Sequence, residues 1–567
     1  MKWFRKKKKT IVELDEILSD TSNVLGFDAG RLEGKTELPI HNSSIYRVGI
    51  IFLIIAVVYV GKSYDLQVVK GEEFLQIAEA NSVNRDIIIA ERGVIYDRNE
   101  EMLVWNEVDE REVYDFPIRS YTDRLGLGQV LGYVSYPKKD KQGFFYRTEY
   151  IGRNGVEAAY DDVLKGQNGN RIMMSDARHK VVSESSVSSP VSGEPITLSV
   201  DGGLSEAMYQ IIATSSAEAG FRSGAGAIMN IHTGELIALT SFPSYDPEIM
   251  ADGYDVETID SYNKDERLPF LNKVVSGAYT PGSIVKPFVA YGALAEKIID
   301  PSKKIISTGE IVIPNPYNPS NPSRFTDWRA HGVMTMREAI AFSSNVYFYI
   351  IGGGFHDQKG LGITKMAEYY RKFGFGSTTG INIAQEQTGV VPDPEWKRAV
   401  FNDDWRLGDT YFTSIGQFGF LVTPIQMLRA YSALANGGFL LTPHVIKGKK
   451  SESIDLNLNQ DYLKIIHEGM RKTVNYNGGT ARALDRKDVA IAAKSGTAEI
   501  GAGSAFVNSW AAGFFPYDNP EYAFILMMDK APRSNALGAT RIMGDVVEWM
   551  SKHRPGYLGI EVEKDNI

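Results

Sequence analysis

One uncharged hydrophobic segment stands near the start of the chain, from Val48 to Gly61. Arg47 and Lys62 flank it, and tyrosines occur at both of its ends. Basic side chains at such positions can reach the membrane surface, where tyrosine is also enriched. With its flanks, residues 45–66, the segment is about 22 residues long, or roughly 33 Å of helix. No small-residue cleavage site follows it, so we predict one uncleaved membrane-spanning helix after a cytoplasmic tail at residues 1–44.

Short apolar runs separated by turn residues follow this anchor. Asp86–Ala90 and Gly93–Tyr96 have the composition of strands, and Asp97–Asn99 that of a turn. Ser183–Gly193 is rich in serine and proline, which predicts a linker. We therefore expect a β-rich domain over residues 67–200, with the main domain boundary near its end.

From about residue 201 the pattern alternates helical stretches with strands. Ala227–Ile231 and Leu236–Thr240 enclose a polar turn and predict a hairpin. Ala523–Met528 predicts a further strand. Strands at both ends with helices between them predict an α+β domain at residues 201–553, whose sheet joins distant segments of the chain. Residues 554–567 would form a C-terminal tail.

Composition narrows the class of protein. A chain of 567 residues and 62.9 kDa is too long for one ordinary domain, and 43% hydrophobic with 23% charged residues is a globular composition. The formal charge of −9 and the pI near 5.6 argue against binding nucleic acid through a basic surface. Cysteine is absent, which excludes disulfides, thiol nucleophiles and cysteine-ligated metals.

A serine–lysine pair supplies the first candidate chemistry. In Ser283-Ile-Val-Lys286 a helical spacing places the ammonium one turn from the hydroxyl, where a neutral lysine could take the serine proton. Ser135 and Ser261 have the same spacing to a lysine. Only Ser283 follows a turn-like stretch and precedes an apolar helix, Val285–Ile298, so its hydroxyl is expected at a helix N-terminus, which favours developing negative charge.

Two further motifs follow in the chain. Ser343-Ser-Asn345 lies inside an apolar stretch and, taken alone, is more typical of a helix cap than of a catalytic motif. Lys494-Ser-Gly-Thr497 follows the apolar run Val489–Ala493, and a lysine at the end of a strand beside small hydroxylated residues can bind a carboxylate. The three motifs in this order match the signature of serine–lysine acyltransferases that recognise penicillin.

Other catalytic chemistries lack their motifs. The eight histidines include no H-x-x-x-H pair, and the chain has no catalytic G-x-S-x-G elbow and no phosphate-binding loop. Asp327 and His331 are two potential ligands without a third, so zinc is not expected. We predict no metal and no organic cofactor.

The chain resembles the class B penicillin-binding proteins, and most of all their elongation-type branch, which are peptidoglycan D,D-transpeptidases. Asp327-Trp328 and Ser344–Tyr349 are more similar to that branch than to the division branch. The resemblance implies a serine β-lactamase-like α+β domain, with an antiparallel sheet flanked by helices, on a dimerisation-type pedestal. It reaches to about His553, and the further segments that carry it are Leu66–Gly71, Arg92–Asn99, Gly152–Glu157, Ser241–Pro247, Gly416-Gln417, Thr423–Gln426 and Asn436–Gly438.

The resemblance also implies roles for the motif residues. Ser283 would be the acylated nucleophile and Lys286 its base. Ser343 and Asn345 would relay protons and hold the substrate amide, and Lys494 would tune that network.

By the same resemblance, the side chains of Ser495 and Thr497, with Gly496 between them, would bind the substrate's terminal carboxylate. The backbone N–H groups of Ser283 and Thr497 would form the oxyanion hole. The chain departs from the family where Phe418 replaces the usual glycine. Some relatives also have a zinc site that uses cysteine. Because this chain has no cysteine, we do not predict that zinc site here.

The partners implied are stem peptides ending in D-Ala-D-Ala, β-lactams, a SEDS-type glycosyltransferase and elongation-complex proteins, with no nucleic acid. The chain would cross the cell membrane once, with its N-terminus in the cytoplasm and its catalytic domain outside. Alternatives are a division-type transpeptidase, a D,D-carboxypeptidase or β-lactamase that passes the acyl group to water, and an inactive wall-assembly scaffold. A β-lactam sensor would need further membrane spans, and a bifunctional polymerase would need a glycosyltransferase motif in the pedestal.

Overall fold

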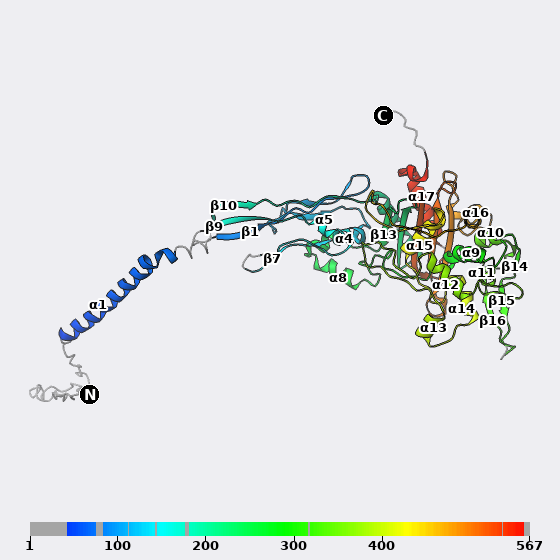
Figure 1. Ribbon diagram of the computed structural model, residues 1–567, viewed down its shortest axis with the longest axis horizontal. Coiled ribbons are helices and arrows are strands. Elements are labelled where there is room, and N and C mark those ends of the chain that lie inside the picture. Colours follow the sequence, from blue (N-terminus) through cyan, green and yellow to red (C-terminus); the bar gives the residue numbers. More distant parts are fainter. Residues whose placement is uncertain are drawn as a thin grey trace, which may run out of the picture. The chain divides into compact units, whose positions relative to one another are not determined.

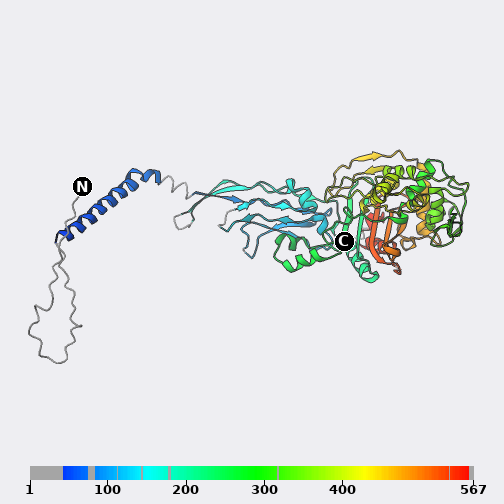
Figure 2. The same cartoon turned by 90° about the horizontal axis from the view of Figure 1, so that it is seen from below.

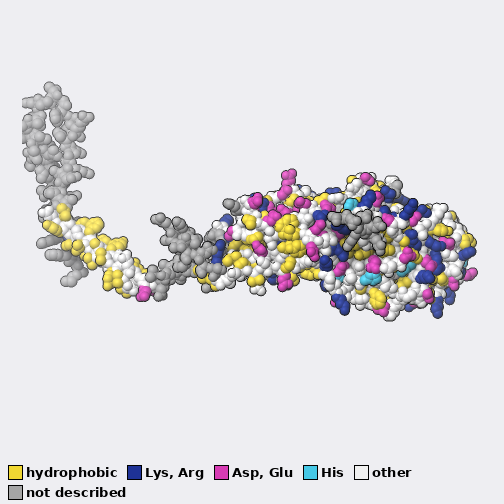
Figure 3. Space-filling model, turned by 90° about the horizontal axis from the view of Figure 1, so that it is seen from above, with side chains coloured by type: hydrophobic (Ala, Val, Ile, Leu, Met, Phe, Trp, Pro, Cys, Tyr) yellow, Lys and Arg dark blue, Asp and Glu magenta, His cyan; other side chains and the backbone are white. Residues whose placement is uncertain are grey.

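The computed structural model describes residues 42–74, 83–111, 113–141, 145–175, 181–315, 318–535 and 537–560 (Figure 1). The predicted N-terminal tail therefore lies almost wholly outside the described residues, whereas residues 554–560 of the predicted C-terminal tail are described and contain the 3-10 turn η7 (Pro555–Leu558). Helix α1 spans Asn42–Tyr64 and continues as the π-helical turn η3, Asp65–Val69. None of its side chains is buried, and Figure 3 shows hydrophobic side chains exposed along it. Its length and composition suffice to cross a bilayer, as predicted for residues 45–66.

Residues 83–197 form short strands and short helices, drawn in blue to cyan in Figure 2. One sheet has the order β1-β9-β10 and another the order β11-β2-β3-β4, and two further two-stranded sheets pair β5 with β8 and β6 with β7. The predicted strands over Asp86–Ala90 and Gly93–Tyr96 correspond to β1 and β2. The elements are β1 (Val83–Ile88), β2 (Ile95–Tyr96), β3 (Met102–Glu107), β4 (Ile118–Tyr121), α3 (Gly128–Leu131), β5 (Val134–Ser135), β6 (Lys138–Lys139), β7 (Phe145–Arg147), β8 (Ile151–Gly152), α4 (Gly155–Ala159), α5 (Asp161–Leu164), β9 (Gly169–Ser175), β10 (Val181–Ser188) and β11 (Ile196–Thr197).

The predicted linker at Ser183–Gly193 is wrong over most of its length, because Val181–Ser188 is strand β10. This strand pairs with β9. Backbone hydrogen bonds hold such a strand whatever its side chains, so a serine-rich composition does not prevent it. After β10 the chain returns to the other sheet, where β11 pairs in parallel with β2 through Ile196 and Ile95.

A buried ion cluster ties the pedestal together. Glu157, at the start of α4, accepts from Arg92 Nε at 2.5 Å and from Arg119 Nε at 2.8 Å, and all three side chains are fully buried. Arg92 also donates to the Glu157 carbonyl, and Arg119 to the Gly93 carbonyl, each at 2.7 Å. Two of the motif segments identified in the sequence, Arg92–Asn99 and Gly152–Glu157, thus meet at one site.

The remaining residues build an α+β domain around one five-stranded antiparallel sheet of order β13-β12-β22-β21-β20. The predicted hairpin is β12 (Ser223–Asn230) with β13 (Leu236–Phe242), and the predicted strand at Ala523–Met528 lies in β22 (Tyr522–Pro532). Because β22 pairs with β12, the sheet joins segments about 300 residues apart, as predicted.

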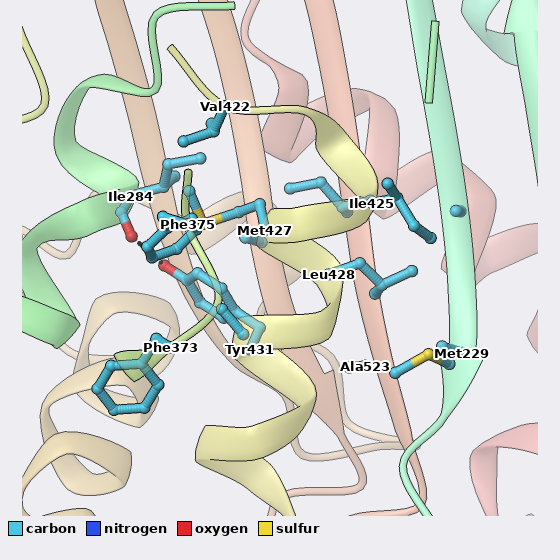
Figure 4. Close-up of a cluster of buried hydrophobic side chains, with 14 of the residues drawn as sticks. Met229, Ile284, Phe373, Phe375, Val422, Ile425, Met427, Leu428, Tyr431 and Ala523 are labelled. Atoms are coloured by element: carbon cyan, nitrogen blue, oxygen red, sulfur yellow. Dashed lines mark hydrogen bonds between the residues drawn. The ribbon is translucent and has the colours of Figure 1, made fainter. Parts of the chain in front are cut away.

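Helices cover both faces of this sheet. Along β22, Ala523, Ile525 and Met527 pack into one core and Phe524, Leu526 and Met528 into the other, which is the alternation of a strand buried on both faces. Helices α6 (Gly202–Ala219) and α17 (Ala539–His553) cover one face, and α15 (Pro424–Ala435) and α16 (Gln460–Asn475) the other. In Figure 4, Ile425, Leu428 and Tyr431 of α15 lie in the same cluster as Met229 and Ala523.

The other elements of this domain complete the list. They are α7 (Pro247–Asp252), α8 (Val256–Lys264), η4 (Gly282–Val285), α9 (Lys286–Ala295), β14 (Ile305–Ser307), β15 (Glu310–Ile313), β16 (Ser323–Thr326), β17 (Gly332–Met334), α10 (Met336–Phe342), α11 (Asn345–Gly353), α12 (Ile363–Lys372), α13 (Pro394–Phe401), α14 (Leu407–Ser414), β18 (Phe439–Leu441), β19 (Ser453–Asp455), η5 (Arg482–Leu484), β20 (Ala492–Ile500), η6 (Ala502–Ser504), β21 (Phe506–Phe515) and η7 (Pro555–Leu558).

Candidate active site

Ser283 lies in the 3-10 turn η4, directly before α9. The helix predicted over Val285–Ile298 is observed at Lys286–Ala295, so the hydroxyl does precede a helix N-terminus. Gly282 adopts φ +59, and a Cβ there would lie 2.7 Å from the Thr497 carbonyl oxygen. A glycine is needed for this close approach, which packs the Ser283 turn against β20. The turn is also held from the core, where the Tyr431 hydroxyl donates to the Ile284 carbonyl at 2.8 Å (Figure 4).

Lys286 is completely buried one helical turn from Ser283. Its ammonium donates to the Ser343 carbonyl at 2.7 Å, to Asn345 Oδ1 at 2.8 Å and to Ser343 Oγ at 3.3 Å. Burial lowers the pKa of Lys286 to about 7, and the negative charge of Asp327 opposes this shift. An amine with this pKa is partly neutral near pH 7, as a general base must be.

The apolar stretch around Ser343 is two helices rather than one. Helix α10 ends at Ser343, which adopts the left-handed conformation with φ +57, and α11 begins after Ser344. Asp327 fixes this junction, because its Oδ2 accepts from Ser344 Oγ at 2.7 Å and from Val346 N at 3.0 Å. The residue that caps a helix is therefore Ser344, at the start of α11, whereas Ser343 lines the cleft.

Lys494 is the second buried lysine, and it lies on β20. The sequence predicts that a strand ends at this residue, and that prediction is wrong: β20 begins at Ala492 and runs through the whole motif, because every residue from Ala492 to Ile500 has a partner on β21. Lys494 Nζ donates to Ser343 Oγ at 2.8 Å and to the Ser495 carbonyl at 2.9 Å. Burial and then the nearby Lys286 lower the pKa of Lys494 well below its ordinary value.

The three motifs meet at one cleft of about 980 Å³. Lys286 and Lys494 are buried next to the cleft, and their ammonium groups donate hydrogen bonds to side chains that line it. Lys286 donates to Ser343 and Asn345, and Lys494 donates to Ser343. Thr480, which the sequence motifs do not include, also lines the cleft and accepts a 2.6 Å hydrogen bond from Ser495 Oγ. The predicted site residues that line the cleft are Ser283, Ser343, Asn345, Ser495, Gly496 and Thr497.

Comparison with known proteins identifies the two domains. The model of the penicillin-binding protein transpeptidase domain matches residues 224–548, and that of the penicillin-binding protein dimerisation domain matches residues 111–198. The peptidoglycan D,D-transpeptidase MrdA of Acinetobacter baumannii is 32% identical over 393 residues, which are 66% of this chain and 55% of that protein. The chain thus aligns with little more than half the length of that relative.

Solved structures cover more of the chain. The penicillin-binding protein PBP2 of Helicobacter pylori, solved in complex with MreC, superposes with a TM-score of 0.69 at 25% identity, over 84% of this chain and 99% of that one. A chain of a peptidoglycan synthase complex that coordinates polymerization and crosslinking superposes with a TM-score of 0.70 at 25% identity, over 92% and 100%. The chain therefore belongs to the penicillin-binding protein transpeptidase family, and within it is similar to the peptidoglycan D,D-transpeptidases named MrdA.

Proposed function

We propose that Ser283 forms the acyl-enzyme through which this chain cross-links peptidoglycan stem peptides during cell elongation. Ser283 Oγ attacks the carbonyl carbon of the D-Ala-D-Ala peptide bond while neutral Lys286 takes the hydroxyl proton. The carbon–nitrogen bond breaks, and the departing D-alanine amine receives a proton. An amine of a neighbouring stem then attacks the ester, loses its proton, and returns Ser283 to the hydroxyl form as the cross-link forms.

The observation that carries this proposal is the burial of Lys286 one turn from Ser283, with its pKa lowered to about 7. An ammonium with an ordinary pKa would be almost fully charged near pH 7 and could not accept the serine proton. In this chain the residue spaced to act as the base is also the residue whose surroundings favour the neutral form.

The rest of the site completes the reaction. Ser343 accepts hydrogen bonds from both lysines, so it can pass a proton between them. The exposed hydroxyl of Thr497 and that of Ser495 would bind the terminal carboxylate. The backbone N–H groups of Ser283 and Thr497 would stabilise the oxyanion, as in related acyltransferases.

The membrane anchor fits an enzyme whose substrate is assembled on the outer face of the membrane. We place residues 1–44 in the cytoplasm, the pedestal at 67–200 and the catalytic domain at 201–553 outside. A transpeptidase without a polymerase domain needs nascent glycan. A SEDS-type glycosyltransferase is the partner that the family resemblance implies, and the solved complex of the similar Helicobacter pylori protein with MreC supports further partners from the elongation machinery.

Product analysis tests this function directly. The purified full-length chain is incubated with a glycan polymerase and lipid-linked precursor, and the stem peptides are separated by mass. We expect cross-linked dimers that disappear with a β-lactam. Trimmed stems without dimers would instead indicate a carboxypeptidase, and unchanged stems an inactive scaffold.

A further inference from the structure

The two N–H groups proposed for the oxyanion hole come from separate elements, Ser283 from η4 and Thr497 from β20. The Thr497 carbonyl faces η4, since a Cβ on Gly282 would lie 2.7 Å from its oxygen. In a strand the N–H and C=O groups of one residue point to the same side, so the Thr497 N–H also points toward η4. The spacing of the two donors therefore depends on how η4 is held against the sheet.

Trp510 holds the turn before Ser283 to this sheet. Its side chain is completely buried on β21, and its Nε1 donates to the Thr280 carbonyl at 3.0 Å. The ring also packs edge to face against Tyr279, with the two centroids 6.3 Å apart. Among the residues that the structure describes, no other hydrogen bond joins the five-stranded sheet to residues 279–285. The direction of this one bond therefore sets how the turn lies on the sheet.

Trp510 is also the cross-strand partner of the glycine in the third motif. Gly496 on β20 pairs with Trp510 on β21. A Cβ on Gly496 would lie 2.8 Å from Ile284 Cγ2 and 3.1 Å from the Pro281 carbonyl oxygen, so the turn lies directly on the strand with no space for a side chain between them. Trp510 thus contacts both of the elements that supply the oxyanion hole.

Backbone hydrogen bonds hold the same turn from its other side. Gly282 N donates to the Gly416 carbonyl at 3.0 Å, and Tyr279 and Val422 form an isolated β-bridge. These bonds attach the turn to the loop of residues 416–422 rather than to β20. Without the bond from Trp510, the turn would be free to shift with that loop relative to Thr497.

We propose that Trp510 is a positioning residue, whose indole N–H keeps the two donors of the oxyanion hole at the spacing that acylation requires. The indole has a single N–H, and Thr280 accepts it. The proton-transfer groups are bonded separately, since Lys286 donates to Ser343. Loss of the indole N–H should therefore weaken the stabilisation of the oxyanion and leave the base unchanged. The proposal rests on the proposed function, because acylation of Ser283 is its readout.

Two variants of the full-length chain remove the bond. Trp510→Phe shortens the ring, whereas β-(3-benzothienyl)alanine introduced at position 510 keeps the two-ring shape and has sulfur in place of the N–H. Acylation by benzylpenicillin is resolved into the dissociation constant of the non-covalent complex and the first-order acylation rate constant. We expect this rate constant to fall at least about tenfold in both variants, with the dissociation constant within about twofold of the parent value.

Two further readouts separate positioning from a purely structural role. In infrared difference spectra the ester carbonyl of the acyl-enzyme should absorb at higher frequency than in the parent, because weaker hydrogen bonds polarise its C=O bond less. The pH midpoint of acylation should stay at the parent value, because the surroundings of Lys286 do not change. Trp105→Phe, which removes an indole hydrogen bond to Glu107 on β3, is the matched control and should leave every measurement unchanged.

The benzothienyl variant decides the matter if Trp510→Phe does not fold. An acylation rate constant equal to that of the parent in this variant would overturn the proposal. A lower rate constant with an unchanged carbonyl frequency, or with a shifted pH midpoint, would also overturn it, because the change would then lie outside the oxyanion hole. Failure of benzylpenicillin to acylate Ser283 in the parent chain would instead refute the proposed function.

Discussion

Lys494 donates a 2.8 Å hydrogen bond to the hydroxyl oxygen of Ser343, the same oxygen that Lys286 approaches at 3.3 Å. Both ammonium groups are fully buried. Two positive charges in one dry site are unfavourable, so the pair favours states with at least one neutral amine. In the proposed mechanism, the Ser343 hydroxyl, placed between them, would let the two lysines share the proton that Lys286 removes from Ser283.

Acylation should depend on pH through Lys286. Its pKa is lowered to about 7, so the neutral fraction, and with it the acylation rate constant, should rise as the pH increases from 5 to 8 with a midpoint near 7. Lys286→Ala should retain the fold but acylate about 10²- to 10⁴-fold more slowly. Stopped-flow measurement with a fluorescent penicillin checks both, and a rate constant that does not change over this pH range would contradict the assignment.

Asp327→Asn should move this pH profile toward acid. The carboxylate of Asp327 favours the charged form of Lys286 and so raises its pKa against the effect of burial. Removing that charge should lower the pKa further, and the midpoint should fall below that of the parent. Asp260→Asn, which removes an exposed carboxylate on α8, is the matched control and should leave the midpoint in place. A shift toward alkaline pH in Asp327→Asn would be evidence against the proposed coupling.

Glu157→Gln should destabilise the pedestal. It leaves Arg119 buried without its anionic partner and Arg92 with only its pair to Asp161 at 2.7 Å, and breaking a buried ion pair typically costs about 3–5 kcal/mol. Asp162→Asn, which breaks an exposed pair with Lys165 in the neighbouring helix, should have no measurable effect. Denaturant unfolding followed by tryptophan fluorescence compares the two, and equal midpoints would show that the cluster does not stabilise the fold.

The topology prediction concerns the side of the membrane. If residues after the anchor lie outside the cytoplasm, protease added to intact spheroplasts should digest the catalytic domain and leave the anchor with the tail at residues 1–44. A tag at the N-terminus should survive until the membrane is dissolved. Protection of the catalytic domain in intact spheroplasts would reverse the proposed orientation.

Much of the candidate site could be predicted from short motifs, because the reactive groups within each motif are close together in the sequence. Ser283 and Lys286 are one helical turn apart, so their relation follows from spacing alone. The meeting of Ser343 with Lys494, which are 151 residues apart, was implied only by the family resemblance. The cap that Asp327 forms on α11 could not be predicted, since it depends on a contact between separate elements.

The two wrong secondary-structure predictions have a common physical origin. The sequence predicts a linker at Ser183–Gly193, most of which belongs to strand β10 (Val181–Ser188), and a strand end at Lys494, in both cases because polar residues interrupt the hydrophobic pattern. Each segment is in fact held by backbone pairing with a neighbouring strand, β9 or β21. The pattern of hydrophobic and polar side chains indicates which residues are buried. Strand pairing depends instead on a partner strand, which can be far away in the sequence.

The central claim is that Ser283 alone is acylated, and intact-mass spectrometry with peptide mapping after incubation with a penicillin tests it most directly. Ser135 and Ser261 share the spacing to a lysine but lie on β5 and α8, outside the residues that line the cleft. We predict one adduct, mapped to Ser283 and absent from Ser283→Ala. An adduct on any other serine, or undiminished labelling of Ser283→Ala, would contradict the account.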